Sequence, residues 1–215
     1  MQGKGCHGSM PSAGIDPLNA AAHILIALQE LQARELPMGE PAVLTIGTLH
    51  SGNAANAIPD SAVMGGTIRT FSEETRAMLK KRMEEIAAGV AGAFRATATV
   101  SYGSGCPVLK NDTALAGQVE GFTRELLGDN ACYSAAQLMA ASGGSRSAGG
   151  SEDFAYVSQE VPSLMLALAA GQPEKGYRWP QHHPMVTFDE EALAPGNTVY
   201  AYTALRWLEE NPGKD

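Results

Sequence analysis

The order in which helical and extended patterns alternate from Asp16 to Tyr102 is the strongest constraint on how this chain can fold. Apolar residues at helical spacing predict one helix from Asp16 to about Leu36 and a second helix that begins after Ser72. Runs rich in β-branched residues predict strands at 42–50, 61–71 and 96–102. The order helix, strand, strand, helix, strand is that of a ferredoxin-like βαββαβ fold that lacks its first strand.

The pattern changes after residues 103–105, where a second unit begins. Helices are expected from Asp112 to Leu127, with Asn111 as N-cap, and from about Asn197 to Glu210, with a Gly/Ser-rich loop at 142–151 between them. The run Leu164–Ala170 is wholly apolar, which predicts a strand buried on both faces, as in an α/β sheet. A single strand of this kind cannot form a doubly covered sheet, so we expect the second unit to be incomplete too.

Composition and charge indicate which kinds of partner and which cellular location to expect. A net charge of −8 and the lack of a basic run argue against binding to nucleic acid. The longest apolar run is far shorter than the ~20 residues that cross a bilayer, and no apolar segment of a secretory signal follows Met1. Cys6, Cys106 and Cys132 are far apart and odd in number, which predicts reduced thiols. The expected location is the cytoplasm.

The short motifs near the N-terminus do not predict nucleotide chemistry. Residues 3–8 match the dinucleotide-binding pattern GxGxxG, but that pattern requires a preceding strand and a helix that opens at the glycines. Neither is expected here, since Pro11 follows closely. No GxSxG or GxxxxGK[ST] sequence occurs, so the sequence does not support a serine hydrolase or a P-loop nucleotide-binding site.

The histidines differ in what their surroundings predict. His23 lies on the polar side of the first helix and is expected to be solvated, and His50 ends a strand beside a turn, where a structural role is the default. His182 and His183 lie in a loop after the expected buried strand, where α/β folds place chemistry, so they fit either a metal ligand or an ordinary loop residue. A catalytic metal needs three protein ligands, and no compact ligand cluster is visible, so any metal site would have to be completed from outside this chain.

Several spaced motifs together resemble one family. They are Gly3-Lys4-Gly5-Cys6-His7-Gly8-Ser9-Met10-Pro11, Asp16-Pro17, Leu28-Gln29, Asn56-Ala57-Ile58-Pro59-Asp60, Gly66-Thr67-Ile68-Arg69-Thr70, Gly150-Ser151-Glu152-Asp153-Phe154, His182-His183-Pro184 and Phe188-Asp189-Glu190. In this order the motifs resemble the M20 metallopeptidase family. The resemblance is greatest to its amidohydrolase branch, which contains hippurate hydrolases, N-acyl-amino-acid amidohydrolases and auxin-conjugate hydrolases.

This resemblance implies an α+β unit followed by an α/β unit. Residues 1–104 would form a ferredoxin-like lid or dimerisation domain, its first strand truncated, and 105–215 the C-terminal half of the α/β metallopeptidase catalytic domain. The complete enzyme would be a homodimer that joins through the lid and cleaves a small acylated amino acid or dipeptide with two divalent metal ions, zinc or manganese. The family's other metal ligands and its general-base glutamate are not in this sequence. We therefore expect this chain alone to hold metal weakly and to be inactive. The pair Glu84-Glu85 lies on an amphipathic helix and is interpreted as a solvated face.

The resemblance also implies roles for individual residues. His182 matches the last metal ligand, and Glu152 would line the catalytic pocket. His7 matches a lid histidine that donates a hydrogen bond to the tetrahedral oxyanion, from the same or a neighbouring subunit. Asn56 and Arg69 match positions that bind the substrate carboxylate. The local alternatives are a tight turn at 56–60 and a surface charge at Arg69. The alternative for the whole chain is a non-catalytic dimerisation or small-molecule-binding module with an open sheet edge.

Overall fold

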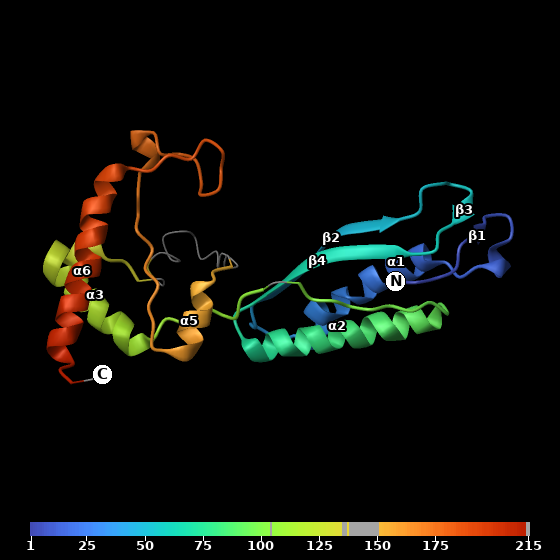
Figure 1. Ribbon diagram of the computed structural model, residues 1–215, viewed down its shortest axis with the longest axis horizontal. Helices are drawn as coiled ribbons and strands as arrows, with labels where there is room; N and C mark the ends of the chain where they lie inside the picture. Colours follow the sequence, from blue (N-terminus) through green and yellow to red (C-terminus); the bar gives the residue numbers. More distant parts are fainter. Residues whose placement is uncertain (104, 135–136, 138–150, 214–215) are drawn as a thin grey trace. The chain divides into compact units, whose positions relative to one another are not determined.

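The computed structural model describes residues 1–103, 105–134, 137 and 151–213, and these fall into two compact units (Figure 1). The first unit contains Met1–Val108, and the second contains most of the described residues from Leu109 onward. The division falls four residues after the expected boundary at 104, and the assignment of the two units to a lid and a catalytic half stays a prediction. None of the described helices is both long and apolar enough to span a membrane.

The first unit begins with a capped helix, α1, at Pro17–Ala27. Asp16 caps it, since its Oδ1 accepts hydrogen bonds from the amides of Leu18 and Asn19 at 2.9 and 3.0 Å. Helical backbone continues beyond α1 to Glu35, close to the expected end at about Leu36, although a turn at Leu28 interrupts the regular α-helix. A π-helical segment at Leu31–Glu35 follows it, and the backbone becomes extended at Leu36, before Pro37.

Two long antiparallel strands, β2 (Ala42–Ser51) and β4 (Ala62–Thr70), form a hairpin beside α1. The register shifts by one residue between Ile46 and Thr48, which is a β-bulge at Gly47. The bulge changes which residues face the core, because side chains alternate between the faces of a strand. This explains why the apolar residues of 42–50 alternate only in part.

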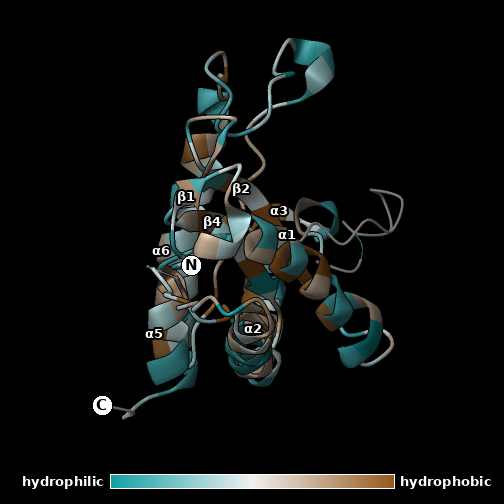
Figure 2. Cartoon of the chain, turned by 90° about the vertical axis from the view of Figure 1, so that its right-hand side faces the viewer, coloured by the Kyte–Doolittle hydropathy of each residue, from teal (hydrophilic) through white to brown (hydrophobic). Residues whose placement is uncertain are grey.

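A second amphipathic helix, α2, spans Glu73–Ala93 and completes the core of this unit. The Ser72 hydroxyl caps it by accepting from the amide of Thr75 at 3.3 Å. Both helices contact the β2–β4 hairpin and lie on the same side of it (Figure 1). Hydrophobic stretches of these elements are coloured brown on the ribbon in Figure 2. The buried members of this core are Ala20, Ile24, Leu28, Leu31, Leu44, Leu79, Ala87, Ala91 and Ala96.

The first residues of the chain occupy the place of the missing first strand. Gln2 pairs antiparallel with Ser61 on one side and with Thr97 on the other, which is where a ferredoxin-like sheet places its first strand. The expected mixture of helices and strands in a ferredoxin-like order is confirmed. The predicted strand at 96–102, however, is wrong beyond the bridge at Thr97. Within the described chain, residues 98–102 form no further bridge, so the pairing does not extend beyond Thr97.

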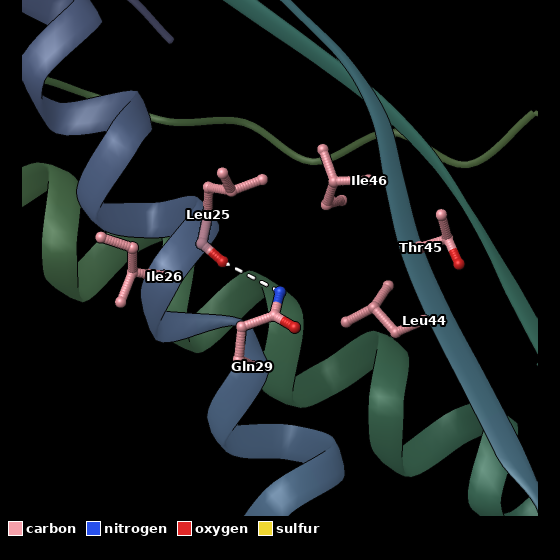
Figure 3. Close-up of a pocket in the computed structure, with 6 residues that line it drawn as sticks. All are labelled: Leu25, Ile26, Gln29, Leu44, Thr45 and Ile46. Carbon is pink, nitrogen blue, oxygen red and sulfur yellow. Dashed lines mark hydrogen bonds between the residues drawn. The ribbon is translucent and has the colours of Figure 1, made fainter.

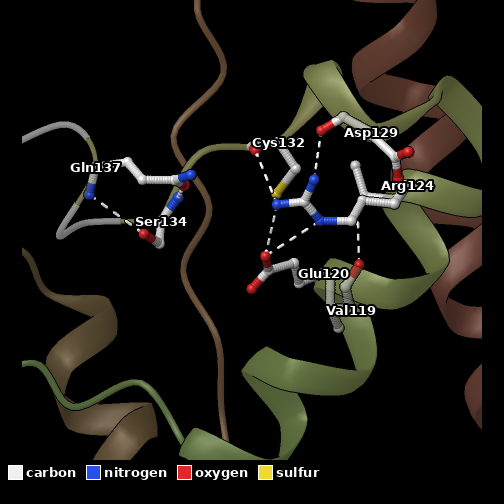
Figure 4. Close-up of polar contacts among 8 residues, drawn as sticks. Val119, Glu120, Arg124, Asp129, Cys132, Ser134 and Gln137 are labelled. Carbon is white, nitrogen blue, oxygen red and sulfur yellow. Dashed lines mark hydrogen bonds and ion pairs between the residues drawn. The ribbon is translucent and has the colours of Figure 1, made fainter. Parts of the chain in front are cut away.

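Two helices form the framework of the second unit. They are α3 (Thr113–Leu127) and α6 (Leu193–Glu210), and they pack against each other. A shorter helix, α5, spans Phe154–Glu160. The Arg206 guanidinium on α6 lies 3.0 Å from the Glu125 carboxylate on α3. At the end of α3, Arg124 binds Glu120 and the carbonyl oxygens of Asp129 and Cys132, which fixes the chain beyond the helix (Figure 4).

The cap of α3 differs from the expected one. Asp112, rather than Asn111, accepts from the first turn, at 2.8 Å from the amide of Leu115. The Asn111 amide instead binds both backbone groups of Met165, at 2.9 and 3.2 Å. Asn111 therefore fixes the apolar run 164–170 in place, while Asp112 begins the helix.

The predicted buried strand at Leu164–Ala170 is wrong for this structure. The run forms no strand, and Met165, Leu166 and Leu168 are 41%, 51% and 53% exposed. A parallel strand needs neighbouring strands on both sides to satisfy its backbone groups. No such strand is present among the residues that the structure describes in this unit. The Gly/Ser-rich loop expected at 142–151 lies outside the described residues except for Ser151.

Candidate active site

Strand pairing brings two of the expected site residues together. The short strand β1 (Cys6–His7) pairs antiparallel with β3 (Ala57–Ile58), with His7 opposite Ala57. The amide of Gly8 donates to the carbonyl oxygen of Asn56 at 2.7 Å. His7 and Asn56, which are 49 positions apart, therefore occupy adjacent exposed positions on one small sheet. Asn56 does lie in a turn, and that turn is what places it beside His7.

The His7 imidazole is oriented by the residue two positions later. The Ser9 amide donates to Nδ1 at 3.1 Å, and the Ser9 hydroxyl lies 2.7 Å from the same nitrogen. An amide can only donate, so Nδ1 carries a lone pair and the proton of the neutral ring is on Nε2. Nε2 makes no hydrogen bond within the described chain, so it can donate outward. Sequence reasoning missed Ser9, because only the turn from His7 to Met10 brings its hydroxyl back to the ring.

Arg69 lies at the opposite end of the hairpin from this pair. In β4 it is paired with Val43, whereas Ala62, at the end nearer to β1 and β3, is paired with Ser51. Seven steps from one residue to the next along the extended strand lead from Ala62 to Arg69, which is roughly 23 Å at about 3.3 Å per residue. The structure therefore does not bring Arg69 together with His7 and Asn56 within one copy of the first unit.

The loop at 182–184 presents its two histidines differently. His183 stacks on Trp179, with 4.1 Å between ring centroids and 8° between planes, and its Nδ1 accepts from the amide of Met185 at 3.1 Å. His182 is exposed, and its φ of 71° places it in the left-handed region, which a non-glycine residue adopts at a cost. Its imidazole has no hydrogen-bond partner among the described residues. This arrangement favours His182 over His183 as the available ligand.

Glu152 is half-buried at the start of α5. Its Oε1 accepts from the amide of Phe154 at 3.3 Å, and its carbonyl oxygen accepts from the amide of Ala155 at 3.2 Å. Both contacts satisfy amides of the first helical turn. Glu152 thus has a structural role in this unit, and its placement in a catalytic pocket stays a prediction.

The described residues by themselves do not fit a metal centre. No group of three or more His, Cys, Asp or Glu side chains among them lies close enough to hold an ion. A catalytic zinc needs three protein ligands, and His182 could supply one. Glu84 and Glu85 are exposed on α2, and Glu85 pairs with Arg82, so they behave as the expected solvated face.

The remaining histidines, His23 and His50, lie on α1 and β2. His23 is exposed on α1, where its Nδ1 lies 2.9 Å from the carbonyl oxygen of Asn19, and its ring lies 4.6 Å from that of Phe94. His50 is exposed on β2 opposite Val63. The exposure of His23 agrees with the expected solvated position, whereas a structural role for His50 stays a prediction.

A shallow pocket of about 350 Å³ lies between α1 and β2 in the first unit (Figure 3). Leu25, Ile26 and Gln29 line it from the helix, and Leu44, Thr45 and Ile46 line it from the strand. Ile26 is 67% exposed. In the described chain β2 pairs only with β4, so its other edge is open next to this apolar surface.

Comparisons with known proteins find a family match in the first unit and relatives that are similar to the chain over both units. The M20 peptidase dimerisation domain matches residues 1–94. N-acetyl-L-cysteine deacetylase of Bacillus subtilis is 32% identical over 98% of this chain and 47% of its own length. IAA-amino acid hydrolase ILR1-like 2 of Arabidopsis thaliana is 33% identical over 99% of this chain and 46% of its own length. The chain spans about half the length of the curated relatives that it matches.

Two crystal structures resemble this one over most of the chain. One is a Staphylococcus aureus protein described as an aminohydrolase, with a TM-score of 0.78 and 27% identity, over 95% of this chain and 48% of that one. The other is the Bacillus subtilis YXEP protein, a dinuclear metal-binding peptidase, with a TM-score of 0.68 and 28% identity, over 91% of this chain and 47% of that one.

Proposed function

Because the chain belongs to the M20 peptidase family, we propose that it is part of a metal-dependent amidohydrolase that cleaves N-acyl amino acids, hippurate-like ones included, or small peptides. The observation that carries the proposal is the pairing of β1 with β3, which sets an Nε2–H donor on His7 beside Asn56 at an exposed position. A donor aimed at a developing oxyanion, next to an amide side chain that can bind the substrate, suits amide hydrolysis.

The separation of Arg69 from His7 supports a dimeric site. The positions of Ala62 and Arg69 at the two ends of β4 are roughly 23 Å apart, which a small substrate cannot span, so one copy cannot use both ends of the hairpin on the same molecule. Two copies related by a two-fold axis could place the His7 end of one beside the Arg69 end of the other. Of the two arrangements open to His7, we therefore propose donation across the dimer, into the neighbouring subunit's substrate site.

We propose that the two copies join along the open edge of β2 and the pocket beside α1. An unpaired edge with exposed apolar residues such as Ile26 is a surface that proteins usually cover. Extending the sheet across two copies would satisfy the edge and bury the pocket shown in Figure 3.

The second unit supplies His182 as one ligand of a pair of divalent ions, zinc or manganese. The remaining ligands and the general base would come from polypeptide that corresponds to the other half of the relatives' length. The exposed apolar run 164–170 supports this, because its sequence is typical of a buried strand but it has no neighbouring strand among the described residues of its unit. We propose that the substrate is a small molecule. We also propose a cytoplasmic location, because a reducing compartment suits the three free thiols. The 215-residue chain alone is expected to be inactive.

A chimeric enzyme tests the activity. In Bacillus subtilis N-acetyl-L-cysteine deacetylase, the region that matches this chain would be replaced by the chain itself, and hydrolysis of acyl amino acids would be assayed with zinc or manganese. We expect turnover by the chimera and none by the isolated chain. We also expect His182→Ala to abolish turnover, while His183→Ala reduces it less. A folded, metal-loaded chimera without turnover would contradict the proposal and favour the non-catalytic binding module.

Subunit mixing tests the shared site. Chimeras carrying His7→Ala or Arg69→Ala should each be inactive. Mixed in equal amounts and allowed to exchange subunits, they should regain about a quarter of the activity, because half of the dimers are mixed and each holds one intact site. No recovery in verified mixed dimers would place both residues in one subunit's site.

The interface is tested by sedimentation of the isolated chain. Wild type should be a dimer, whereas Ile26→Glu should be monomeric because it places a charge in the pocket. Met38→Glu is the matched control, since Met38 is fully exposed in a turn and does not line the pocket. A wild-type monomer, or an Ile26→Glu dimer as stable as wild type, would refute this interface.

A further inference from the structure

We propose that Ser9 is a positioning residue that holds His7 as the Nε2–H tautomer and so presents a hydrogen-bond donor at the candidate active site. The inference deepens the proposed function, because the donor would act on the substrate oxyanion. It rests on contacts within the first unit, however, and these can be measured without any substrate.

Both donors of Ser9 converge on one ring nitrogen. The amide lies 3.1 Å and the hydroxyl 2.7 Å from Nδ1 of His7. The amide requires a lone pair on Nδ1, and once that lone pair is present, the hydroxyl oxygen is the donor of the shorter contact. A ring turned over by half a rotation would lose both bonds. Ser9 therefore specifies which nitrogen carries the proton and also which way the ring faces.

The backbone around His7 is fixed independently of the ring. The amide of Met10 donates to the carbonyl oxygen of His7 at 2.8 Å, which closes a tight turn over residues 7–10. The bond from Gly8 to Asn56 ties the start of this turn to β3. With the turn anchored at both ends, the serine hydroxyl has only a short distance to reach the ring.

The choice of tautomer decides what His7 can do. A neutral imidazole has one donor and one acceptor nitrogen. With the proton on Nε2, the outward nitrogen donates and stabilises a developing oxyanion. With the proton on Nδ1, the outward nitrogen would present a lone pair and repel the same oxyanion. Ser9 would thus matter more in the transition state than in the bound substrate, where the carbonyl oxygen carries less charge.

The direct test is nitrogen-15 NMR of histidine-labelled 215-residue chain, at a pH above the ordinary imidazole range. We expect the His7 signals of wild type to show a protonated Nε2 and an unprotonated Nδ1. Ser9→Ala keeps the amide but removes the hydroxyl, so a measurable fraction of the Nδ1–H form should appear. Ser9→Thr, which keeps a hydroxyl, should restore the wild-type pattern. Ser12→Ala is the control, since the Ser12 hydroxyl makes no hydrogen bond within the described chain.

The same variants in the chimera separate this inference from the proposed function. Loss of one neutral hydrogen bond should lower kcat about fivefold in Ser9→Ala with little change in KM, and Ser9→Thr should recover it. Protonated Nδ1 in wild type, or a Ser9→Ala variant with wild-type tautomer and kcat, would overturn the role of Ser9 while leaving the proposed function intact. An inactive wild-type chimera with the expected tautomer would overturn the proposed function alone.

Discussion

Replacing Gly8 by alanine tests whether the β1–β3 pairing positions His7. A Cβ added at Gly8 would lie 2.8 Å from the carbonyl oxygen of Asn56, and this oxygen is the acceptor of the Gly8 amide. Ordinary contact begins at 3.4 Å, so the two segments must separate by about 0.6 Å. The obstacle is backbone, which cannot rotate away as a side chain can. The substitution should therefore stretch or break the bond that seats His7 beside Asn56.

The expected effect is large on rate and small on stability. A misplacement of about 1 Å at a reacting group costs on the order of a hundredfold in rate, so a 0.6 Å shift should cost between about ten- and a hundredfold in kcat of the chimera. The strand pair is short and exposed, so the free energy of unfolding should fall by only about 1 kcal/mol, the value of one hydrogen bond.

Kinetics of the chimera and urea unfolding of the isolated chain measure the two quantities separately. Gly103→Ala is the matched control, because a Cβ there meets no atom within 4 Å. A Gly8→Ala chimera with the kcat of wild type would show that the β1–β3 pairing does not position His7. A loss of rate that global unfolding fully accounts for would contradict the prediction too, because the change would then not be local to His7.

Three further predictions concern stability. Leu79→Ala empties a fully buried position of the first core and should lower the unfolding free energy by about 3 kcal/mol, measured by urea denaturation with far-ultraviolet circular dichroism, whereas Met38→Ala should change it by less than about 0.5 kcal/mol. Asp112→Ala removes the cap of α3 and should cost about 1 kcal/mol, followed by fluorescence of Trp179 and Trp207, both in the second unit; an unchanged midpoint would refute the cap. Burial, together with the charge of Glu84, raises the pKa of Tyr102 to about 12. Because the folded pKa lies above the unfolded one, the contribution of Tyr102 to stability is complete below pH ~10. This contribution is lost as the pH rises to about 12. Phenolate absorbance should show one late-titrating tyrosine that Tyr102→Phe abolishes.

Local sequence patterns were sufficient to predict most of the helices and strands. The helix at Glu73–Ala93 and the strands β2 and β4 follow from apolar periodicity, capping residues and turn residues, because these signals act within a few positions of one another. The spaced motifs likewise indicated the family, since each depends on residues close in the chain. The amino-acid sequence was thus enough to name Arg69, Asn56 and His7 as candidate site residues.

The tertiary structure decided which of the strand-like segments pair with a neighbouring strand. The runs 96–102 and 164–170 are strand-like in sequence, yet neither forms a full strand, because a strand is stabilised by a neighbour that local sequence does not specify. The distance between Arg69 and His7, and the contact of Ser9 with the imidazole, also depend on pairing and on a turn. Sequence alone therefore determined most elements and the candidate site residues. Strand pairing decided where these residues lie, and the turn after His7 decided which of its ring nitrogens carries the proton.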